Sequence, residues 1–213
     1  MNPLSVIVPF KAVDGKSRLS SDLSPADRRA LSELMLLDVL RAVRGAGLVD
    51  RCVVVSSDRR ALSLASRSGA TPARETSDKG VDAAVERGMR FLKGWDRFLV
   101  LPSDLPLLTA RELASVANLG SRFDSVVSPS KSFDGTNLLI FSRSPRLELS
   151  YDSDSFWNHV RAVARNSSTL AVHCSRGVLF DVDSPGDLRE LAGTRINTRS
   201  VEFARKKLSA WAS

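Results

Sequence analysis

The sequence predicts an α/β protein built on a mostly parallel β-sheet. Short runs rich in valine, isoleucine and leucine alternate along the chain with longer segments whose apolar residues recur with a helical period. Strands that alternate with helices form crossover units, in which the strands lie parallel and the helices cover the sheet. The length of 213 residues, without an internal repeat or a low-complexity linker, predicts a single domain over residues 1–213.

Composition narrows the class of protein. Apolar residues make up 43% of the chain and charged residues 26%, and no apolar run approaches the roughly 18 residues of a membrane span. A strand pattern starts at Leu4 and leaves no room for a signal peptide, so we expect a cytoplasmic protein without membrane contact. Cys52 and Cys174 lie in strand-like segments and are expected to serve packing rather than a zinc site or a disulfide.

The first half of the chain alternates strands with helices. Residues 4–10 have the near-continuous apolar pattern of a buried strand, and residues 11–20 are expected to form a loop. Ser24 and Pro25 start a helix that ends near Gly45 and Gly47. Further strands are predicted at 52–56 and 97–101, and further helices at 58–68 and 80–93.

The second half predicts a mixed sheet that completes the site. Thr109 and Glu112 form the capping box of another helix, and strands are expected at 125–127, 137–142, 169–173 and 177–181. A helix is predicted at 154–165. Ser184 caps a short helix, with Asp187 in its first turn, and residues 201–211 form a basic amphipathic helix.

Polar residues that follow the predicted strands are the first candidates for a site, because open α/β sheets bind ligands beyond the carboxyl ends of their strands. The loop after residue 10 carries Lys11, Lys16 and Arg18. It has neither the glycine pattern of a dinucleotide site nor that of a P-loop. Cations and loop N–H groups suit a triphosphate, and a solvated surface loop explains the same residues equally well.

Carboxylates follow two other predicted strands. Asp104 lies between two prolines after an apolar strand, and Asp181 and Asp183 lie on one side of an extended segment. Carboxylates in such surroundings suit a hard cation such as Mg²⁺. Two other interpretations stay open: Asp104 closes a turn, or one of the later acids serves the next helix, as Asp187 is expected to do.

Four motifs together resemble the 2-phospho-L-lactate guanylyltransferases of coenzyme F420 biosynthesis. They are VPFKAVDGKSRL at residues 8–19, LPSDLPL at 101–107, DGTN at 134–137 and DVDSPGDL at 181–188. The resemblance covers nearly the whole chain and implies a Rossmann-like, three-layer GT-A nucleotidyltransferase fold with a mixed, mostly parallel sheet. It also implies transfer of GMP from GTP to 2-phospho-L-lactate with release of pyrophosphate, whereas relatives use phosphoenolpyruvate or 3-phosphoglycerate.

The resemblance implies a role for each candidate residue. It assigns GTP to Lys11, Lys16, Ser17, Arg18, Ser57 and Gly80, assigns Mg²⁺ to Asp104, Asp183 and Asp181, and assigns the acceptor acid to Thr136, Asn137 and Ser155. The implied catalytic set is Lys11, Lys16, Arg18, Asp104 and Asp183.

Two residues depart from the family pattern. Asp152 stands where the family tends to have glycine in the acceptor segment, and Asp82 stands where relatives usually have asparagine near the nucleotide. A carboxylate beside an anionic acceptor repels it unless a cation intervenes. The identity of the acceptor acid is therefore open, and which of Asp181 and Asp183 is the main metal ligand is open as well.

The implied reaction needs no general base, because a phosphate monoester has a second pKa near ~6 and is ionised at neutral pH. We therefore assign no role to His159 or His173. The net charge of +7 favours anionic partners, but scattered basic residues and 6% aromatic residues argue against nucleic acid. Three alternative functions stay open: a different nucleotidyltransferase of the same fold, a non-catalytic nucleotide-binding module and a nucleic-acid-binding protein. The protein is also a possible homodimer.

Overall fold

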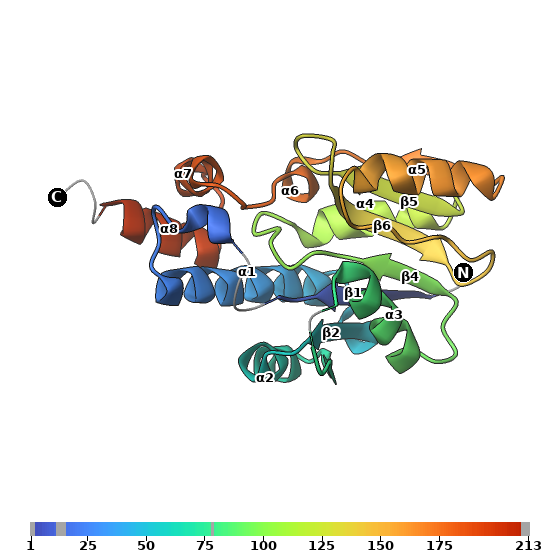
Figure 1. Ribbon diagram of the computed structural model, residues 1–213, viewed down its shortest axis with the longest axis horizontal. Coiled ribbons are helices and arrows are strands. Elements are labelled where there is room, and N and C mark those ends of the chain that lie inside the picture. The colour runs from blue at the N-terminus through green and yellow to red at the C-terminus, as the bar shows by residue number, and fades with distance from the viewer. Residues whose placement is uncertain (1–2, 12–15, 78, 210–213) are drawn as a thin grey trace.

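A seven-stranded sheet organises the computed structural model, which describes residues 3–11, 16–77 and 79–209 (Figure 1). The strands are β1 (Leu4–Pro9), β2 (Cys52–Ser56), β3 (Thr71–Arg74), β4 (Arg97–Val100), β5 (Ser125–Pro129), β6 (Thr136–Ser142) and β7 (Leu170–Val172). Their order is β3-β2-β1-β4-β6-β5-β7. Strand β6 runs antiparallel to β4 and β5, and the other neighbouring pairs are parallel. The expectation of a mixed, mostly parallel sheet is confirmed.

Helices cover both faces of this sheet. They are α1 (Pro25–Gly45), α2 (Arg59–Arg67), α3 (Val81–Phe91), α4 (Ala110–Gly120), α5 (Ser155–Arg165), α6 (Arg176–Leu179), α7 (Pro185–Gly193) and α8 (Arg199–Ser209). Successive side chains of β1 point to opposite faces, so Val6 and Val8 pack with α1, α2 and α4, whereas Ile7 packs with α3 and α5. None of the described helices is both long and apolar enough to cross a membrane.

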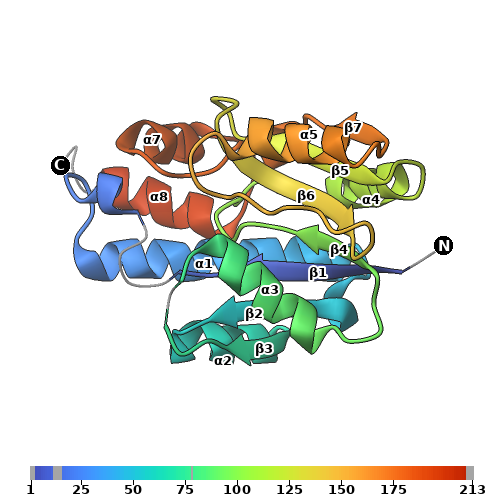
Figure 2. The ribbon, with the colours of Figure 1, turned by 45° about the vertical axis from the view of Figure 1, so that its right-hand side comes forward.

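Helix α3 packs against the sheet at β1 and β2 (Figure 2). A Cβ atom built on Gly88 of α3 would lie 2.6 Å from Ile7 Cγ2 of β1, so only glycine permits this approach without a shift. The close packing matters for function because the N-terminus of α3 and the carboxyl end of β1 border the same cavity.

The C-terminal helix α8 packs beside α1, and α7 packs against α8 (Figures 1 and 2). The buried carboxylate of Asp38 in α1 joins α1 to α8. It accepts hydrogen bonds from the backbone N–H groups of Arg199 and Ser200 and from the Ser200 hydroxyl. These N–H groups belong to the first turn of α8 and have no partner within the helix, so Asp38 acts as a cap supplied by another helix.

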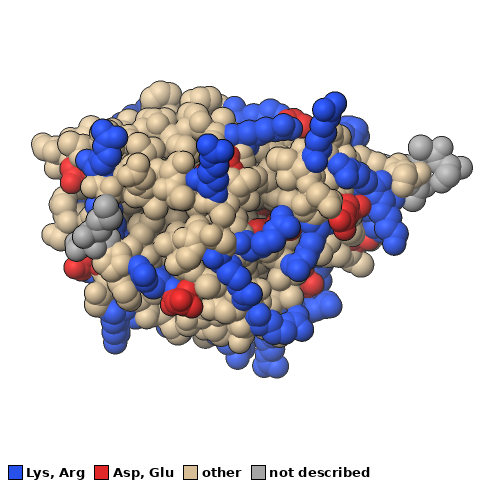
Figure 3. All heavy atoms as spheres, turned by 180° about the vertical axis from the view of Figure 1, so that it is seen from behind, with Lys and Arg blue, Asp and Glu red and all other residues tan. Residues whose placement is uncertain are grey.

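The excess of basic residues is visible on the surface. Lys and Arg side chains are spread over the face seen from behind, with few Asp and Glu side chains among them (Figure 3). This distribution matches the net charge of +7. A positive surface attracts anionic small molecules at long range, with an effect that salt screens.

The predicted helix starts are confirmed. Ser24 accepts a backbone hydrogen bond from the first turn of α1, and complete capping boxes join Thr109 to Glu112 in α4 and Ser184 to Asp187 in α7. These signals are local, because the side chain satisfies N–H groups within three residues of itself.

Residues 177–181 form no strand, contrary to the prediction. They begin within the helical turn α6 and continue as extended chain outside the sheet. The backbone at Gly177 is held against α4: its N–H donates to Glu112 Oε1 at 2.8 Å, and an added Cβ would lie 2.6 Å from the Leu107 carbonyl oxygen. The apolar residues of this segment suit a strand, but its contacts with Glu112 and Leu107 lie outside the sheet and involve residues far away in the sequence.

Two further details differ from the sequence-based expectations. Strand β3 was not predicted, because it is short, mostly exposed and contains Pro72. Proline is tolerated there because β3 is an edge strand, where one row of N–H groups needs no partner. Cys52 is buried as expected, but Cys174 is exposed, so the packing role expected for Cys174 is wrong.

Candidate active site

A cavity of about 750 Å³ lies at the carboxyl ends of β1 and β4. Its other walls come from the start of α3, the turn between β5 and β6, the segment before α5 and the segment before α7. This is the edge at which open α/β sheets bind ligands. The candidate residues that line it are Lys11, Lys16, Arg18, Gly80, Asp104, Thr136, Asn137, Ser155, Asp181 and Asp183.

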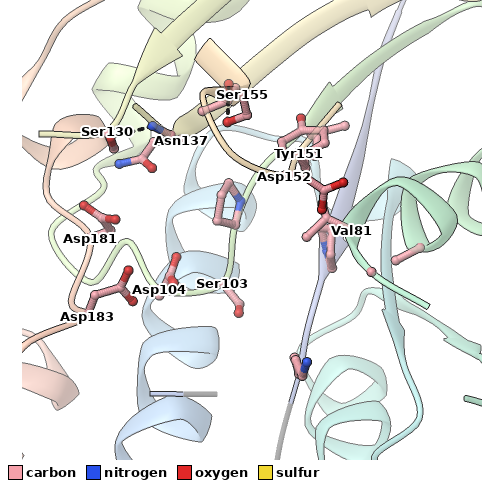
Figure 4. Close-up of a pocket in the computed structure, with 18 of the residues that line it drawn as sticks. Val81, Ser103, Asp104, Ser130, Asn137, Tyr151, Asp152, Ser155, Asp181 and Asp183 are labelled. Atoms are coloured by element: carbon pink, nitrogen blue, oxygen red, sulfur yellow. Dashed lines mark hydrogen bonds between the residues drawn. The ribbon is translucent and has the colours of Figure 1, made fainter. Parts of the chain in front are cut away.

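Three carboxylates, those of Asp104, Asp181 and Asp183, form an acidic cluster on one side of the cavity (Figure 4). The ammonium group of Lys16 lies between two of them. It donates hydrogen bonds to Asp104 Oδ2 and Asp183 Oδ1, each at 2.5 Å. A loop after the first strand, a turn after the fourth strand and a segment near the C-terminus thus meet at one point.

The pKa values of two side chains reflect this crowding. Burial by itself lowers the pKa of Lys16, but the carboxylates of Asp104 and Asp183 outweigh burial and hold that pKa above its ordinary value. Burial raises the pKa of Asp181 to about 6, with repulsion from Asp104 and Asp183 as the further causes. A single ammonium cannot balance the cluster, which therefore attracts additional positive charge.

The acidic cluster fits a hard divalent cation. Asp104 Oδ1 is buried and has no hydrogen-bond partner among the described residues, a condition that costs free energy and that a cation would relieve. Carboxylate oxygens are the protein ligands that Mg²⁺ prefers. Within the described ranges, however, no three His, Cys, Asp or Glu side chains are arranged as a ready metal centre, and Lys16 lies between Asp104 and Asp183.

Local backbone structure holds these charged groups in place. The Asp187 carboxylate, expected only to serve α7, also accepts the backbone N–H of Asp183 at 3.2 Å and of Ser184 at 2.8 Å. Lys16 has a φ of 68°, a left-handed conformation that costs an L-residue on the order of 1 kcal/mol. Such conformations are concentrated at functional sites, where surrounding contacts maintain them.

Two hydroxyl groups form another wall of the cavity. Thr136 and Ser155 are 6% and 2% exposed, and Ser155 Oγ donates a hydrogen bond to Thr136 Oγ1 at 3.1 Å. Asn137 is tied to the chain near α6, because its Nδ2 donates to the Val178 carbonyl oxygen at 2.9 Å. His159, to which the sequence gave no role, places Nδ1 3.0 Å from Thr136 Oγ1.

The residues assigned to the nucleotide are only partly brought together. Lys11 and Arg18 line the cavity, whereas Ser17 and Ser57 do not, so the structure lends no support to a nucleotide contact by either serine. Gly80 also lines the cavity and precedes α3 with a φ of 91°, which only glycine adopts readily. Residues 12–15 of the predicted phosphate loop lie outside the described residues.

Of the two departures from the family pattern, only Asp152 lines the cavity, and Asp82 contacts the residue that precedes Asp152. Asp152 lies beside Tyr151 in the cavity wall (Figure 4). Asp82 of α3 accepts the backbone N–H of Tyr151 at 3.0 Å. Burial raises the pKa of Asp82, and repulsion from Asp152 and Glu86 raises it further. Asp82 thus connects the start of α3 to the segment before α5, and places a second negative charge near Asp152.

Sequence reasoning missed several residues of the cavity wall. Glu75 follows β3, so recognition of that edge strand would have identified it as a strand-end residue. Ser130 and Ser132 hold the turn before β6, because their hydroxyls donate to Asp134 Oδ1. Tyr151 lines the cavity with its hydroxyl oxygen buried and unpartnered among the described residues. No local sequence signal identifies these hydroxyl groups.

Comparisons with known proteins show a family and relatives to which the whole chain is similar. The family model described as "Guanylyl transferase CofC like" matches residues 4–209. The 2-phospho-L-lactate guanylyltransferase of Methanothermobacter thermautotrophicus is 31% identical over 207 residues, which cover 97% of this chain and 91% of that protein. The phosphoenolpyruvate guanylyltransferase of Rubrobacter xylanophilus is 38% identical over 190 residues, covering 87% and 91%.

Solved structures show the same fold. A nucleotidyl transferase from Methanothermobacter thermautotrophicus superposes with a TM-score of 0.65 at 19% identity, over 97% of this chain and all of the other. A cytidylyltransferase from Leptospira borgpetersenii superposes with a TM-score of 0.60 at 11% identity, over 98% and 95%. The nucleotidyltransferase fold implied by the four motifs is thereby confirmed.

Proposed function

Because the chain belongs to the CofC-like guanylyl transferase family, we propose that it transfers GMP from GTP to 2-phospho-L-lactate, or to a closely related phosphorylated acid, and releases pyrophosphate. One observation carries the proposal. The acidic cluster with Lys16 and the hydroxyl pair of Thr136 and Ser155 border a single cavity, which is large enough for a nucleotide and a small acid.

The proposed chemistry is an in-line displacement at phosphorus. An oxygen of the acceptor phosphate attacks the α-phosphorus of GTP, a new P–O bond forms, and the bond from the α-phosphorus to the bridging oxygen breaks, so that pyrophosphate leaves with the electron pair. The attacking phosphate is already ionised at neutral pH, so no side chain has to remove a proton. His159 is fully buried and is not proposed as a general base.

The residues of the cavity would act by position and charge. Lys11, Lys16 and Arg18 are proposed to bind the phosphates of GTP, where cations stabilise the charge of the leaving pyrophosphate. Asp104 and Asp183, with Asp181, are the proposed ligands of Mg²⁺, which when bound would neutralise phosphate charge and orient both substrates. Lys16 would then have to leave its present partners for the phosphates.

The acceptor acid is the finer part of the proposal. Thr136, Asn137 and Ser155 are proposed to contact it, since their side chains line the cavity beside the acidic cluster. Phosphoenolpyruvate is the second candidate, because the relative that is named for that acceptor is 38% identical to this chain. Both acids carry a carboxylate and a phosphate on one carbon atom, so the same donors can serve either.

One experiment tests the activity and its alternatives. The purified protein is incubated with Mg²⁺, each of the four NTPs, and 2-phospho-L-lactate, phosphoenolpyruvate or 3-phosphoglycerate, while pyrophosphate is measured and the product is weighed by mass spectrometry. We expect GTP with 2-phospho-L-lactate to react fastest. A faster reaction with phosphoenolpyruvate would identify that acid as the acceptor, and a faster reaction with another NTP would identify a different nucleotide donor. Absence of pyrophosphate in every mixture would contradict the proposal.

The cytoplasmic location is not tested by this experiment and stays a prediction.

A further inference from the structure

His159 occupies a defined position behind the cavity wall. The side chain is fully buried, on α5, and both of its ring nitrogens have partners. Nε2 lies 3.1 Å from the backbone nitrogen of Ser150, and Nδ1 lies 3.0 Å from Thr136 Oγ1. The ring of Tyr151 packs edge-on against the imidazole, with 4.7 Å between ring centroids, which restricts its orientation.

These contacts select one tautomer of the imidazole. The backbone N–H of Ser150 can only donate a hydrogen bond, so Nε2 of His159 must accept it and carries no proton. The proton of the neutral ring then lies on Nδ1, which donates to Thr136 Oγ1. Burial lowers the pKa of His159 to about 4, so the ring is neutral at pH 7.

The tautomer decides what the two hydroxyl groups can do. Thr136 Oγ1 accepts from His159 and from Ser155, which uses both of its lone pairs. The hydroxyl proton of Thr136 therefore remains for a partner in the cavity. With the other tautomer, Thr136 would donate to Nδ1 and Ser155 would donate to Thr136, which would leave neither proton for an anion.

We infer that His159 is a positioning residue that reserves the hydroxyl proton of Thr136 for an oxygen of the anionic acceptor. The inference rests on the proposed function in one respect, namely that Thr136 contacts the acceptor acid. It extends that function by assigning a role to a residue that touches neither substrate. His159 acts only through Thr136, so its removal should weaken use of the acceptor and leave use of GTP unchanged.

The tautomer can be measured without any substrate. The chain contains only two histidines, so ¹⁵N-labelling of histidine yields two sets of ring signals, and a His173→Asn variant assigns them. We expect a protonated Nδ1 and an unprotonated Nε2 in His159 at pH 7. A protonated Nε2 would overturn the inference whether or not the protein has guanylyltransferase activity, which keeps the two failures apart.

Matched variants test the effect on the reaction. His159→Asn keeps an N–H donor near the position of Nδ1, whereas His159→Gln can reach Ser150 but leaves Thr136 without its donor. We expect His159→Gln to raise the KM for the acceptor about five- to ten-fold, the equivalent of one lost hydrogen bond, with an unchanged KM for GTP. His159→Asn should recover most of the wild-type value. His173→Asn, outside the cavity, should change neither constant.

A double-mutant cycle with Thr136→Val completes the test. If His159 acts through the Thr136 hydroxyl, His159→Gln should have almost no further effect on the acceptor KM once that hydroxyl is absent. Additive effects of the two substitutions would overturn the inference, as would equal changes in the KM values of GTP and acceptor. Thermal unfolding of each variant shows whether the fold is retained. A variant that unfolds is replaced by one that lacks the same group, His159→Leu for His159→Gln or Thr136→Ala for Thr136→Val.

Discussion

Lys16 Nζ lies 2.5 Å from Asp183 Oδ1, although 167 positions separate the two residues along the chain. The same ammonium contacts Asp104, so the N-terminal loop, the turn after β4 and the segment before α7 are held together by one cation. This contact brings charged residues from three distant segments into one site, and most of the following predictions concern that site.

Asp104→Asn and Asp183→Asn should each lower turnover by at least ~100-fold while the protein stays folded. The reason is that stabilisation of phosphate charge by a metal is worth several kcal/mol, and each carboxylate is a proposed ligand. Asp181→Asn should have a milder effect. Initial rates of pyrophosphate release measure this, with the exposed Asp50→Asn as the matched control. Near-wild-type rates would remove that residue from the metal site, and a larger effect at Asp181 than at Asp183 would reverse their roles.

Lys16→Ala or Arg18→Ala should impair turnover or GTP use far more than Arg59→Ala or Arg60→Ala. Lys16 and Arg18 line the cavity, whereas Arg59 is exposed and Arg60 pairs with Glu33 of α1 at 3.5 Å, and neither Arg59 nor Arg60 lines the cavity. Steady-state rates at varied GTP concentration measure the difference. Equal small effects from all four substitutions would show that general charge, rather than this loop, attracts the nucleotide.

Lys16→Met should also increase the response of the protein to Mg²⁺. Without the ammonium, Asp104 and Asp183 repel each other, and a divalent cation would relieve that repulsion. We expect Mg²⁺ to raise the melting temperature of the variant more than that of the wild type, in the absence of nucleotide. An identical shift in both proteins would argue that Lys16 and the metal do not share this place.

Asp152→Gly should lower the KM for the acceptor without altering the KM for GTP, because Asp152 lines the cavity and its charge opposes an anionic ligand. Kinetics with 2-phospho-L-lactate, phosphoenolpyruvate and 3-phosphoglycerate measure the effect for each acid. A kinetically silent substitution would mean that acceptor choice lies elsewhere. A loss of GTP affinity alone would contradict the placement of this segment beside the acceptor.

The stability of the protein should depend on pH through His159. Burial lowers the pKa of His159 from its ordinary value of 6.5 to about 4 in the folded chain. Between pH 4 and pH 6.5 the unfolded state therefore binds more protons than the folded state. The free energy of unfolding should therefore fall as pH falls from about 6.5 to about 4, by on the order of 3 kcal/mol from this residue. Urea unfolding of the wild type and His159→Asn at a series of pH values isolates the effect, because all other titrating groups are shared. Parallel curves would contradict it.

Local patterns in the sequence were sufficient for most helices and strands. The cap at Ser24 and the pair of Ser184 and Asp187 involve residues no more than three positions apart. The near-continuous apolar runs of β1 and β2 are typical of strands buried on both faces of an α/β sheet. The sequence likewise predicted that Asp104 follows the strand β4, whereas Asp183 follows the helical turn α6 and extended chain rather than the predicted strand.

Only the tertiary structure decided the features that depend on contacts between distant segments. The helical turn at Gly177 contacts Glu112 of α4, and Asp38 caps a helix whose first residue lies 161 positions further along the chain. The sequence predicted Lys16 as a phosphate-binding residue, and the structure places its ammonium group between the carboxylates of Asp104 and Asp183. His159 offered no periodic or motif signal, yet the hydrogen bond from Ser150 selects its tautomer. These features depend on burial and on hydrogen-bond partners, and both are set by residues that are neighbours in space. Local sequence patterns do not show which distant residues become such neighbours.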